Sequence, residues 1–292
     1  MKPAPFKYIA AHTLDQALAA KVQYGEDARF LAGGQSLVPA MNFRLAQPDV
    51  LIDINPLAEL AGIVEQAGEG RVRIGALTRY RTLERDAIIA RDLPLVAEAL
   101  PEIAHPQIRN RGTLGGNLAH ADPASEMPAV VLALGGRLRA RSGKGERWIA
   151  AEDFFVSVLT TALAADEMLI EIELPVAPLR TGVAFLELSR RRGDFALMGV
   201  AAVVGLAPDG TCTHARLTYC GAGDKPVLAR DAAQALIGRR MAASDLAQAA
   251  ALAQNAIDPH GNVHASKDYQ RHLAGVLTRR ALQTATERAH VH

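Results

Sequence analysis

Apolar residues recur at two different spacings along the chain. Between residues 13 and 24 the spacing is helical, and Thr13 is placed to cap the first turn. A short strand ending near Ala32, a Gly-Gly turn, a helical pattern over residues 37–45 and a strand over residues 50–54 follow. Strand, turn, helix and strand in this order predict a small parallel unit with a right-handed crossover. A ligand is expected at its turn end.

The pattern changes after this unit. Two short alternating runs, residues 62–66 and 72–75, are joined by a glycine-containing turn and predict an antiparallel hairpin. Further helices are expected at residues 78–85, 95–103 and 125–134, and further strands at 137–141 and 168–174.

Two prolines between residues 174 and 179 mark the expected domain boundary. We therefore divide the chain into residues 1–176, with subdomains of about 1–56 and 57–176, and residues 177–292. The last part shows strand patterns and then alanine-rich helical patterns, which predict an antiparallel sheet carrying helices. The strands are expected at 183–188, 196–206 and 215–220, and the helices at 228–237, 244–256 and 267–290.

Composition excludes several classes of function. The 292 residues carry a formal charge of +1, and their Lys and Arg residues are scattered, which argues against a nucleic-acid surface. No apolar run is long enough to span a membrane and the N-terminus lacks a signal-peptide core, so we expect a cytoplasmic protein. Cys212 and Cys220 form no CxxC pair, and we expect two buried thiols. Redox chemistry would then need a bound organic cofactor.

Two glycine-rich motifs carry the candidate chemistry. Adjacent glycines lack Cβ atoms, so another molecule can lie against their N–H groups, and each pair precedes a helical pattern. Two such turns suggest a diphosphate ligand. Neither motif matches the Rossmann or P-loop fingerprint. The first motif is Ala32, Gly33, Gly34, Gln35 and Ser36, and the second is Thr113, Leu114, Gly115, Gly116 and Asn117.

Together with residues 190–196, Arg-Arg-Arg-Gly-Asp-Phe-Ala, these motifs resemble three marks of the FAD-binding medium subunit of molybdenum hydroxylases, the xanthine dehydrogenase and carbon monoxide dehydrogenase family. The resemblance covers nearly the whole chain. It implies an α+β fold of the vanillyl-alcohol-oxidase (PCMH) type: two N-terminal α/β subdomains, then a C-terminal antiparallel sheet with helices. It also implies that both glycine motifs hold the FAD diphosphate, mainly through backbone N–H groups.

The resemblance extends to single positions. Glu126 matches an acidic residue that contacts FAD, although Asp is more usual there. Leu169 matches a residue lining the adenine or ring pocket, and Ile103 matches an aromatic near the flavin. Both could equally be residues of the hydrophobic core. Leu186 stands where some members carry a Lys beneath the flavin.

Charged residues beside the second motif could in principle bind the diphosphate or have other roles. Arg109 and Arg111 flank it, and we expect solvated or subunit-facing side chains rather than salt bridges to the diphosphate. His105 and His120 are expected to be structural, because the sequence shows no Ser or Cys nucleophile near either.

The expected function is therefore that of an FAD-binding electron-transfer subunit. By resemblance, a large subunit carries molybdopterin, a small subunit carries two [2Fe-2S] clusters, and this chain passes electrons to an external acceptor, in a dimer of heterotrimers. The substrate is decided on the large subunit and stays open. Two alternatives are a non-catalytic scaffold or nucleotide-binding subunit, and a free-standing FAD oxidoreductase.

Overall fold

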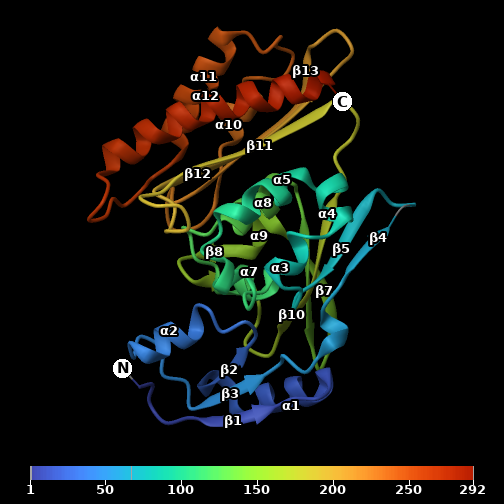
Figure 1. Cartoon of the computed structure of the whole chain (residues 1–292), viewed down its shortest axis with the longest axis vertical. Coiled ribbons are helices and arrows are strands. Elements are labelled where there is room, and N and C mark those ends of the chain that lie inside the picture. The colour runs from blue at the N-terminus through green and yellow to red at the C-terminus, as the bar shows by residue number, and fades with distance from the viewer. Residues whose placement is uncertain (1, 67, 292) are drawn as a thin grey trace.

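A computed structural model describes residues 2–66 and 68–291 of the chain and stacks its three larger sheets along the long axis (Figure 1). The N-terminal sheet has the order β1-β3-β2, and β3 pairs in parallel with both neighbours. The predicted parallel unit is thus confirmed. Its elements are β1 (Lys7–Ala10), α1 (Leu14–Tyr24), η1 (Gly25–Asp27), β2 (Ala28–Leu31), α2 (Leu37–Asn42) and β3 (Val50–Asp53).

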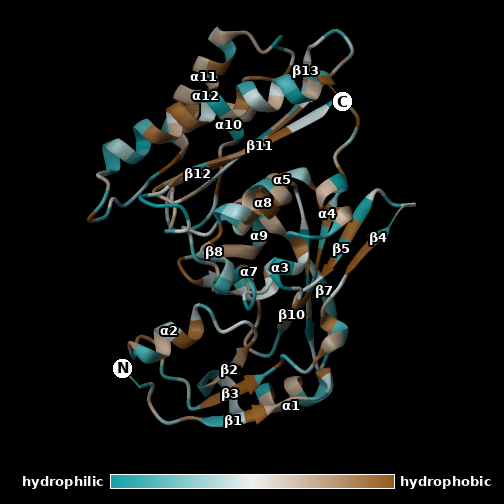
Figure 2. Ribbon diagram, in the orientation of Figure 1, coloured by the Kyte–Doolittle hydropathy of each residue, from teal (hydrophilic) through white to brown (hydrophobic). Residues whose placement is uncertain are grey.

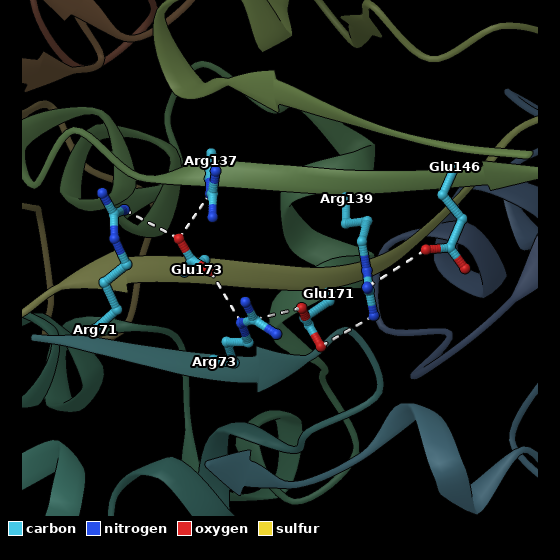
Figure 3. A network of polar contacts seen from close by, with 7 residues as sticks. All are labelled: Arg71, Arg73, Arg137, Arg139, Glu146, Glu171 and Glu173. Carbon is cyan, nitrogen blue, oxygen red and sulfur yellow. Dashed lines mark hydrogen bonds and ion pairs between the residues drawn. The ribbon is translucent and has the colours of Figure 1, made fainter. Parts of the chain in front are cut away.

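The central sheet is antiparallel, with the order β4-β5-β10-β6-β7. β4 and β5 form the predicted hairpin. One face of β10 contributes Ile172 and Leu174 to the central core. The opposite face carries Glu171 and Glu173, which lie among arginines of the neighbouring strands (Figure 3). The strands are β4 (Ile63–Gln66), β5 (Arg71–Gly75), β6 (Arg137–Ser142), β7 (Gly145–Ala150) and β10 (Met168–Pro175).

Short helices cover the inner face of the central sheet. Among them, α8 is buried at every position and lies between the central and C-terminal sheets, in contact with β12 and β13. The remaining elements of this part are η2 (Ala58–Leu60), α3 (Tyr80–Leu83), α4 (Ala87–Asp92), α5 (Pro94–Ala99), η3 (Leu100–Glu102), α6 (Pro106–Arg109), α7 (Leu114–His120), α8 (Glu126–Ala133), α9 (Ala151–Phe154), β8 (Phe155–Ser157) and β9 (Thr160–Thr161).

The C-terminal sheet is antiparallel, with the order β11-β12-β13-β14. Every residue of β12 is buried, because α12 contacts it as well as α8. Figure 2 shows the result: α8 and β12 are largely apolar, whereas polar and apolar residues alternate along α12. The elements are β11 (Thr181–Leu188), β12 (Met198–Leu206), β13 (Cys212–Cys220), β14 (Val227–Leu228), α10 (Arg230–Gln234), α11 (Ala243–Ala256) and α12 (Lys267–Val291).

Some predicted elements differ from the observed ones. The helix expected over residues 37–45 ends at Asn42, and the one expected over residues 95–103 is split into α5 and η3. The strand β7 was not predicted, because its exposed edge position gives it a polar sequence without an apolar alternation. Both cysteines are buried free thiols, as expected. Across the described residues, no helix has both the length and the apolar character needed to cross a membrane.

Candidate dinucleotide-binding site

The first glycine motif follows β2 and presents a row of backbone N–H groups. Gly34 has a φ of +72°, a left-handed conformation that glycine adopts without strain. The Asn55 side chain donates to the carbonyl oxygens of Leu31 and Ala32, at 3.2 and 2.8 Å. Within the described residues, no N–H group from Ala32 to Ser36 donates to an acceptor. Adjacent N–H groups without internal partners suit an anion.

The second glycine motif is not the turn that the sequence suggested. Thr113 caps α7, and both glycines lie inside this helix. The Gly116 N–H donates to Thr113 Oγ1 at 3.1 Å, and the Leu114 and Gly115 N–H groups donate to the carbonyl oxygens of Thr78 and Ala76. The Asn117 N–H donates to Thr113 O. Four N–H groups of this motif, from Leu114 to Asn117, thus already have an acceptor within the chain, unlike those of the first motif. That the second motif holds the diphosphate through its N–H groups stays a prediction.

The glycines of the second motif instead permit close approach. A Cβ on Gly115 would lie 2.4 Å from the Ala76 Cβ, so only glycine fits there. A Cβ on Gly116 would lie 3.4 Å from the Ala32 Cβ. Gly116 of the second motif therefore lies close to Ala32, the first residue of the first motif.

The two motifs meet directly. A Cβ on Gly33 would lie 2.4 Å from Arg111 O and 2.9 Å from the Gly112 Cα, atoms that immediately precede the second motif. Residues more than 70 positions apart in the sequence are thus in direct contact. That separation is the difference between positions 33 and 111.

One side chain that sequence reasoning missed holds this arrangement together. Arg79 donates to the Asn55 Oδ1 and to Arg111 O, and so links the loop behind the first motif to the segment before the second. Burial lowers the pKa of Arg79, and the neighbouring Arg111 charge adds to this. Asn55 itself carried a local signal, since an Asn two residues after a strand that ends in Asp53 is typical of a turn.

The polar groups downstream of the second motif are largely buried. Asn117 Nδ2 donates to Ser125 Oγ at 2.9 Å, whereas Asn117 Oδ1 is buried and has no hydrogen-bond partner in the described structure. Glu126 begins α8 and is only 6% exposed. Burial raises the pKa of Glu126 to about 7, and the charges of Asp122 and Glu102 add to the shift. An unsatisfied oxygen beside an acidic residue indicates a place where a ligand could donate hydrogen bonds.

Leu169 and Ile103 lie in the central core. Their side chains are 5% and 6% exposed, and both belong to the cluster that packs between the central sheet and its helices. Leu169 precedes an irregularity in the pairing of β10 with β6.

Arg109 is buried, which differs from the solvated or subunit-facing side chain expected from the sequence. It is 8% exposed, pairs with Glu84 at 2.8 Å and donates to the Ile103 and Ala104 carbonyl oxygens. These contacts make Arg109 a structural residue that fastens the loop leading to α6, instead of a solvated one. Arg111, in contrast, is exposed as expected.

The geometry defines a class of site. It combines an N–H row for phosphate, a glycine-lined wall and a buried unsatisfied amide oxygen, and these features fit the diphosphate and hydroxyl groups of a dinucleotide such as FAD. No group of three or more His, Cys, Asp or Glu residues among those described could hold a metal ion.

Comparisons with known proteins agree with this class of site. Residues 4–177 match the family model described as the FAD binding domain in molybdopterin dehydrogenase, and residues 183–285 match the CO dehydrogenase flavoprotein C-terminal domain. The chain belongs to the FAD-binding medium subunits of the molybdenum hydroxylase family. Its α+β fold is the one expected, FAD is its cofactor, and it is a flavoprotein subunit of a molybdenum-containing oxidoreductase.

Similar proteins align over almost the full chain. Subunit alpha of the 6-hydroxypseudooxynicotine dehydrogenase complex from Paenarthrobacter nicotinovorans is 41% identical over 99% of this chain and 97% of its own length. Caffeine dehydrogenase subunit beta from Pseudomonas sp. (strain CBB1) is 38% identical, again over 99% and 97%. A structure of carbon monoxide dehydrogenase from Hydrogenophaga pseudoflava, lacking the Mo-pyranopterin moiety of its cofactor, superposes with a TM-score of 0.96 at 38% identity, covering 99% of both chains.

Proposed function

We propose that this chain takes electrons from [2Fe-2S] clusters on a partner subunit and passes them, through FAD, to an external acceptor. The observation that supports this most is the row of open N–H groups at residues 32–36, which lies against the second glycine motif. Bound FAD would supply both one-electron and two-electron chemistry, which allows it to join such carriers. The protein's own task is to hold and orient the cofactor.

Each motif has a separate role in this proposal. The N–H groups of the first motif hold the diphosphate, whereas the second motif provides a wall without Cβ atoms. Asn117 Oδ1 accepts a hydrogen bond from a cofactor hydroxyl, and Glu126 contacts the cofactor beside it. The residues proposed to contact FAD are Ala32, Gly33, Gly34, Gln35, Ser36, Thr113, Leu114, Gly115, Gly116, Asn117, Glu126 and Leu169.

The proposal includes partners. We infer a large molybdopterin subunit and a small [2Fe-2S] subunit, assembled as a dimer of heterotrimers. Support comes from the names of similar proteins, which are described as a subunit alpha, a subunit beta or a medium chain of multi-subunit dehydrogenases.

We also propose a division into an FAD-binding part, residues 1–176, and a C-terminal part, residues 177–292. Residues 176–180 support it, since they separate β10 from β11 and belong to no strand. The two matched family models, which end at residue 177 and begin at residue 183, are compatible with this division.

The cofactor proposal is tested by changing Gly33 to Val in the assembled complex. The new side chain would collide with Arg111 O, so we expect the purified complex to lose most of its FAD. Flavin absorbance, calibrated against protein concentration, measures the loss. Gly143→Ala is the matched control, because a Cβ at Gly143 meets no atom within 4 Å. A Gly33→Val complex with full flavin content would contradict the proposed site.

A further inference from the structure

A second buried group lies where the C-terminal sheet meets the FAD-binding part. Glu187, near the end of β11, has both carboxyl oxygens buried, and neither has a hydrogen-bond partner in the described structure. Alternate residues of the same strand, Val183 and Phe185, belong to the central core, so Glu187 faces the central part of the molecule. A carboxyl group without a partner in such a place needs an explanation.

Local packing makes room for this carboxyl. Glu187 lies opposite Gly199 on β12, and Gly199 lies opposite Cys220 on β13. A Cβ on Gly199 would fall 2.4 Å from the Cys220 Sγ and 3.8 Å from the Glu187 Cγ. The missing side chain therefore leaves space that the Glu187 stem and the Cys220 thiol share.

The same region is fastened to the helix that begins with Glu126. The Gly221 N–H donates to Pro123 O at 2.8 Å, and Thr218 Oγ1 donates to the carbonyl oxygen of Ala129 in α8 at 2.7 Å. The end of β13 thus lies against the start of α8, and the carboxyl groups of Glu126 and Glu187 are close enough for the charge of one to act on the other.

The two charges that act on the pKa of Glu187 are both acidic. Burial raises the pKa of Glu187 to about 9, and the charges of Glu126 on α8 and Glu102 on η3 add to the shift. Cys220 on β13 is a buried thiol whose own pKa is raised by burial and by the Glu187 charge. Glu102 itself pairs with Arg192, which is 73% exposed, at 3.6 Å. Within the described residues, no cation pairs with Glu187.

A second unsatisfied group links this cluster to the glycine motifs. The Tyr80 hydroxyl is fully buried and has no partner in the described structure. Its ring lies beneath Gly112, and burial together with the Glu126 charge raises its pKa. Unsatisfied polar atoms therefore lie in the second motif, at Tyr80 and at Glu187, and the buried Glu126 lies among them.

We propose that Glu126 and Glu187 form a proton-binding pair that takes up a charge-compensating proton when the bound FAD is reduced. The inference rests on the proposed function. Two electrons from the partner's iron-sulfur clusters add negative charge beside the pair, which disfavours ionised carboxylates. One proton from solvent then binds to the pair, in addition to any bound by the flavin. It returns to solvent when the external acceptor removes the two electrons.

The test is the flavin midpoint potential of the assembled complex, followed from about pH 6 to about pH 10. In the wild type we expect the potential to fall more steeply with pH above about 7, where Glu126 ionises in the oxidised complex, and again above about 9, where Glu187 does. Glu187→Gln keeps the shape but cannot ionise, so the additional slope above about pH 9 should be lost, whereas the slope due to Glu126 should remain. Glu187→Asp should retain a titration. Glu173→Gln is the matched control, a buried glutamate on the outer face of another sheet, and should leave the slope unchanged.

A second measurement does not depend on any variant. Reduced-minus-oxidised infrared spectra of the wild-type complex near pH 8 should contain a carboxylic acid band that appears on reduction. Its absence, or an unchanged slope in a Glu187→Gln complex that retains FAD, would overturn the proton-binding pair and leave the proposed function standing. A wild-type complex without flavin would overturn both.

Discussion

Two buried glutamates on consecutive long strands have opposite surroundings. Glu173 on β10 is fully buried, yet Arg71, Arg73 and Arg137 approach its carboxylate at 3.0, 2.9 and 2.6 Å (Figure 3). Burial alone would raise the pKa of Glu173, but the hydrogen bonds from Arg137 and Arg73 outweigh it and lower the pKa. Glu187 has no such partners, and burial raises its pKa to about 9.

The difference shows that burial does not determine the charge of a carboxyl group by itself. Glu173 lies on the outer face of the central sheet, where the three arginines are each 30% to 39% exposed and keep their own contact with water. Glu187 lies between two parts of the fold, and its neighbours are acidic. A fully paired carboxylate fits a structural role, whereas an unpaired one is a candidate for function.

The largest expected effect comes from removing the paired carboxylate. Glu173→Leu leaves three arginines close together without their shared acceptor, and we expect a loss of about 2 to 3 kcal/mol in the free energy of unfolding. Exposure of the arginines keeps the loss below that of a fully buried pair. Urea denaturation followed by circular dichroism measures it. Glu146→Gln, at the exposed edge of the same network, is the control, and an equal effect in both variants would contradict the argument.

The space beside Glu187 is tested by Gly199→Ala. The added methyl group collides with the Cys220 Sγ and crowds the Glu187 stem, so we expect a loss of about 1 to 2 kcal/mol. Gly205→Ala, on the same strand, meets its nearest atoms only at 3.4 Å and should cost less. Thermal unfolding of both variants compares them. Equal melting temperatures would show that the space next to Glu187 is not needed.

The charge state of Glu187 predicts a pH dependence. Its pKa rises from an ordinary 4.5 to about 9 on folding, so between these values the folded chain binds more protons than the unfolded chain. The stability of the wild type should therefore fall as the pH rises, by at most about 1.4 kcal/mol per pH unit from this group.

In Glu187→Gln this contribution to the slope disappears. Urea titrations at several pH values measure the difference between the two proteins. The contribution of Glu173 to stability depends on pH in the opposite direction, because its pKa is lowered on folding. The stability it provides is present above its ordinary pKa of 4.5 and is lost as the pH falls through the lowered value. Identical slopes for wild type and Glu187→Gln would remove the contrast between the two glutamates.

The smallest effect is expected at the outer edge of the paired cluster. Arg71 is 38% exposed, and when its side chain is removed two other arginines still pair with Glu173. Arg71→Ala should cost about 0.5 kcal/mol, and less in high salt. Chemical denaturation at low and high salt checks both statements. A loss as large as that of Glu173→Leu would mean that the three arginines do not share the carboxylate.

Much of the fold could be predicted because its signals are local. The helix expected over residues 267–290 is observed as α12, and the hairpin of β4 and β5 follows from alternation and its turn. The glycine pair of the second motif misled the prediction. Glycine disfavours helix, but the Thr113 cap and the contacts with Ala76 and Thr78 outweigh that preference.

The site could be predicted only in part. Both motifs are contiguous in the sequence, and two glycine turns suggest one shared diphosphate ligand, so the sequence predicts that the motifs lie close together. Residues that act across long separations gave no signal. Arg79 bridges the motifs, the buried Arg109 pairs with Glu84, and the raised pKa of Glu187 depends on burial and on charges from other elements. Such properties depend on tertiary packing, which spacing along the chain does not report.

The contacts of Arg79 have a consequence for sequence variation among relatives. Its side chain needs the side-chain oxygen of Asn55, but from Arg111 it uses only a main-chain carbonyl, which any residue supplies. In an alignment, positions 55 and 79 should therefore change together, whereas position 111 should vary independently of both. Covariation at two positions would record how the halves of the cofactor site are joined.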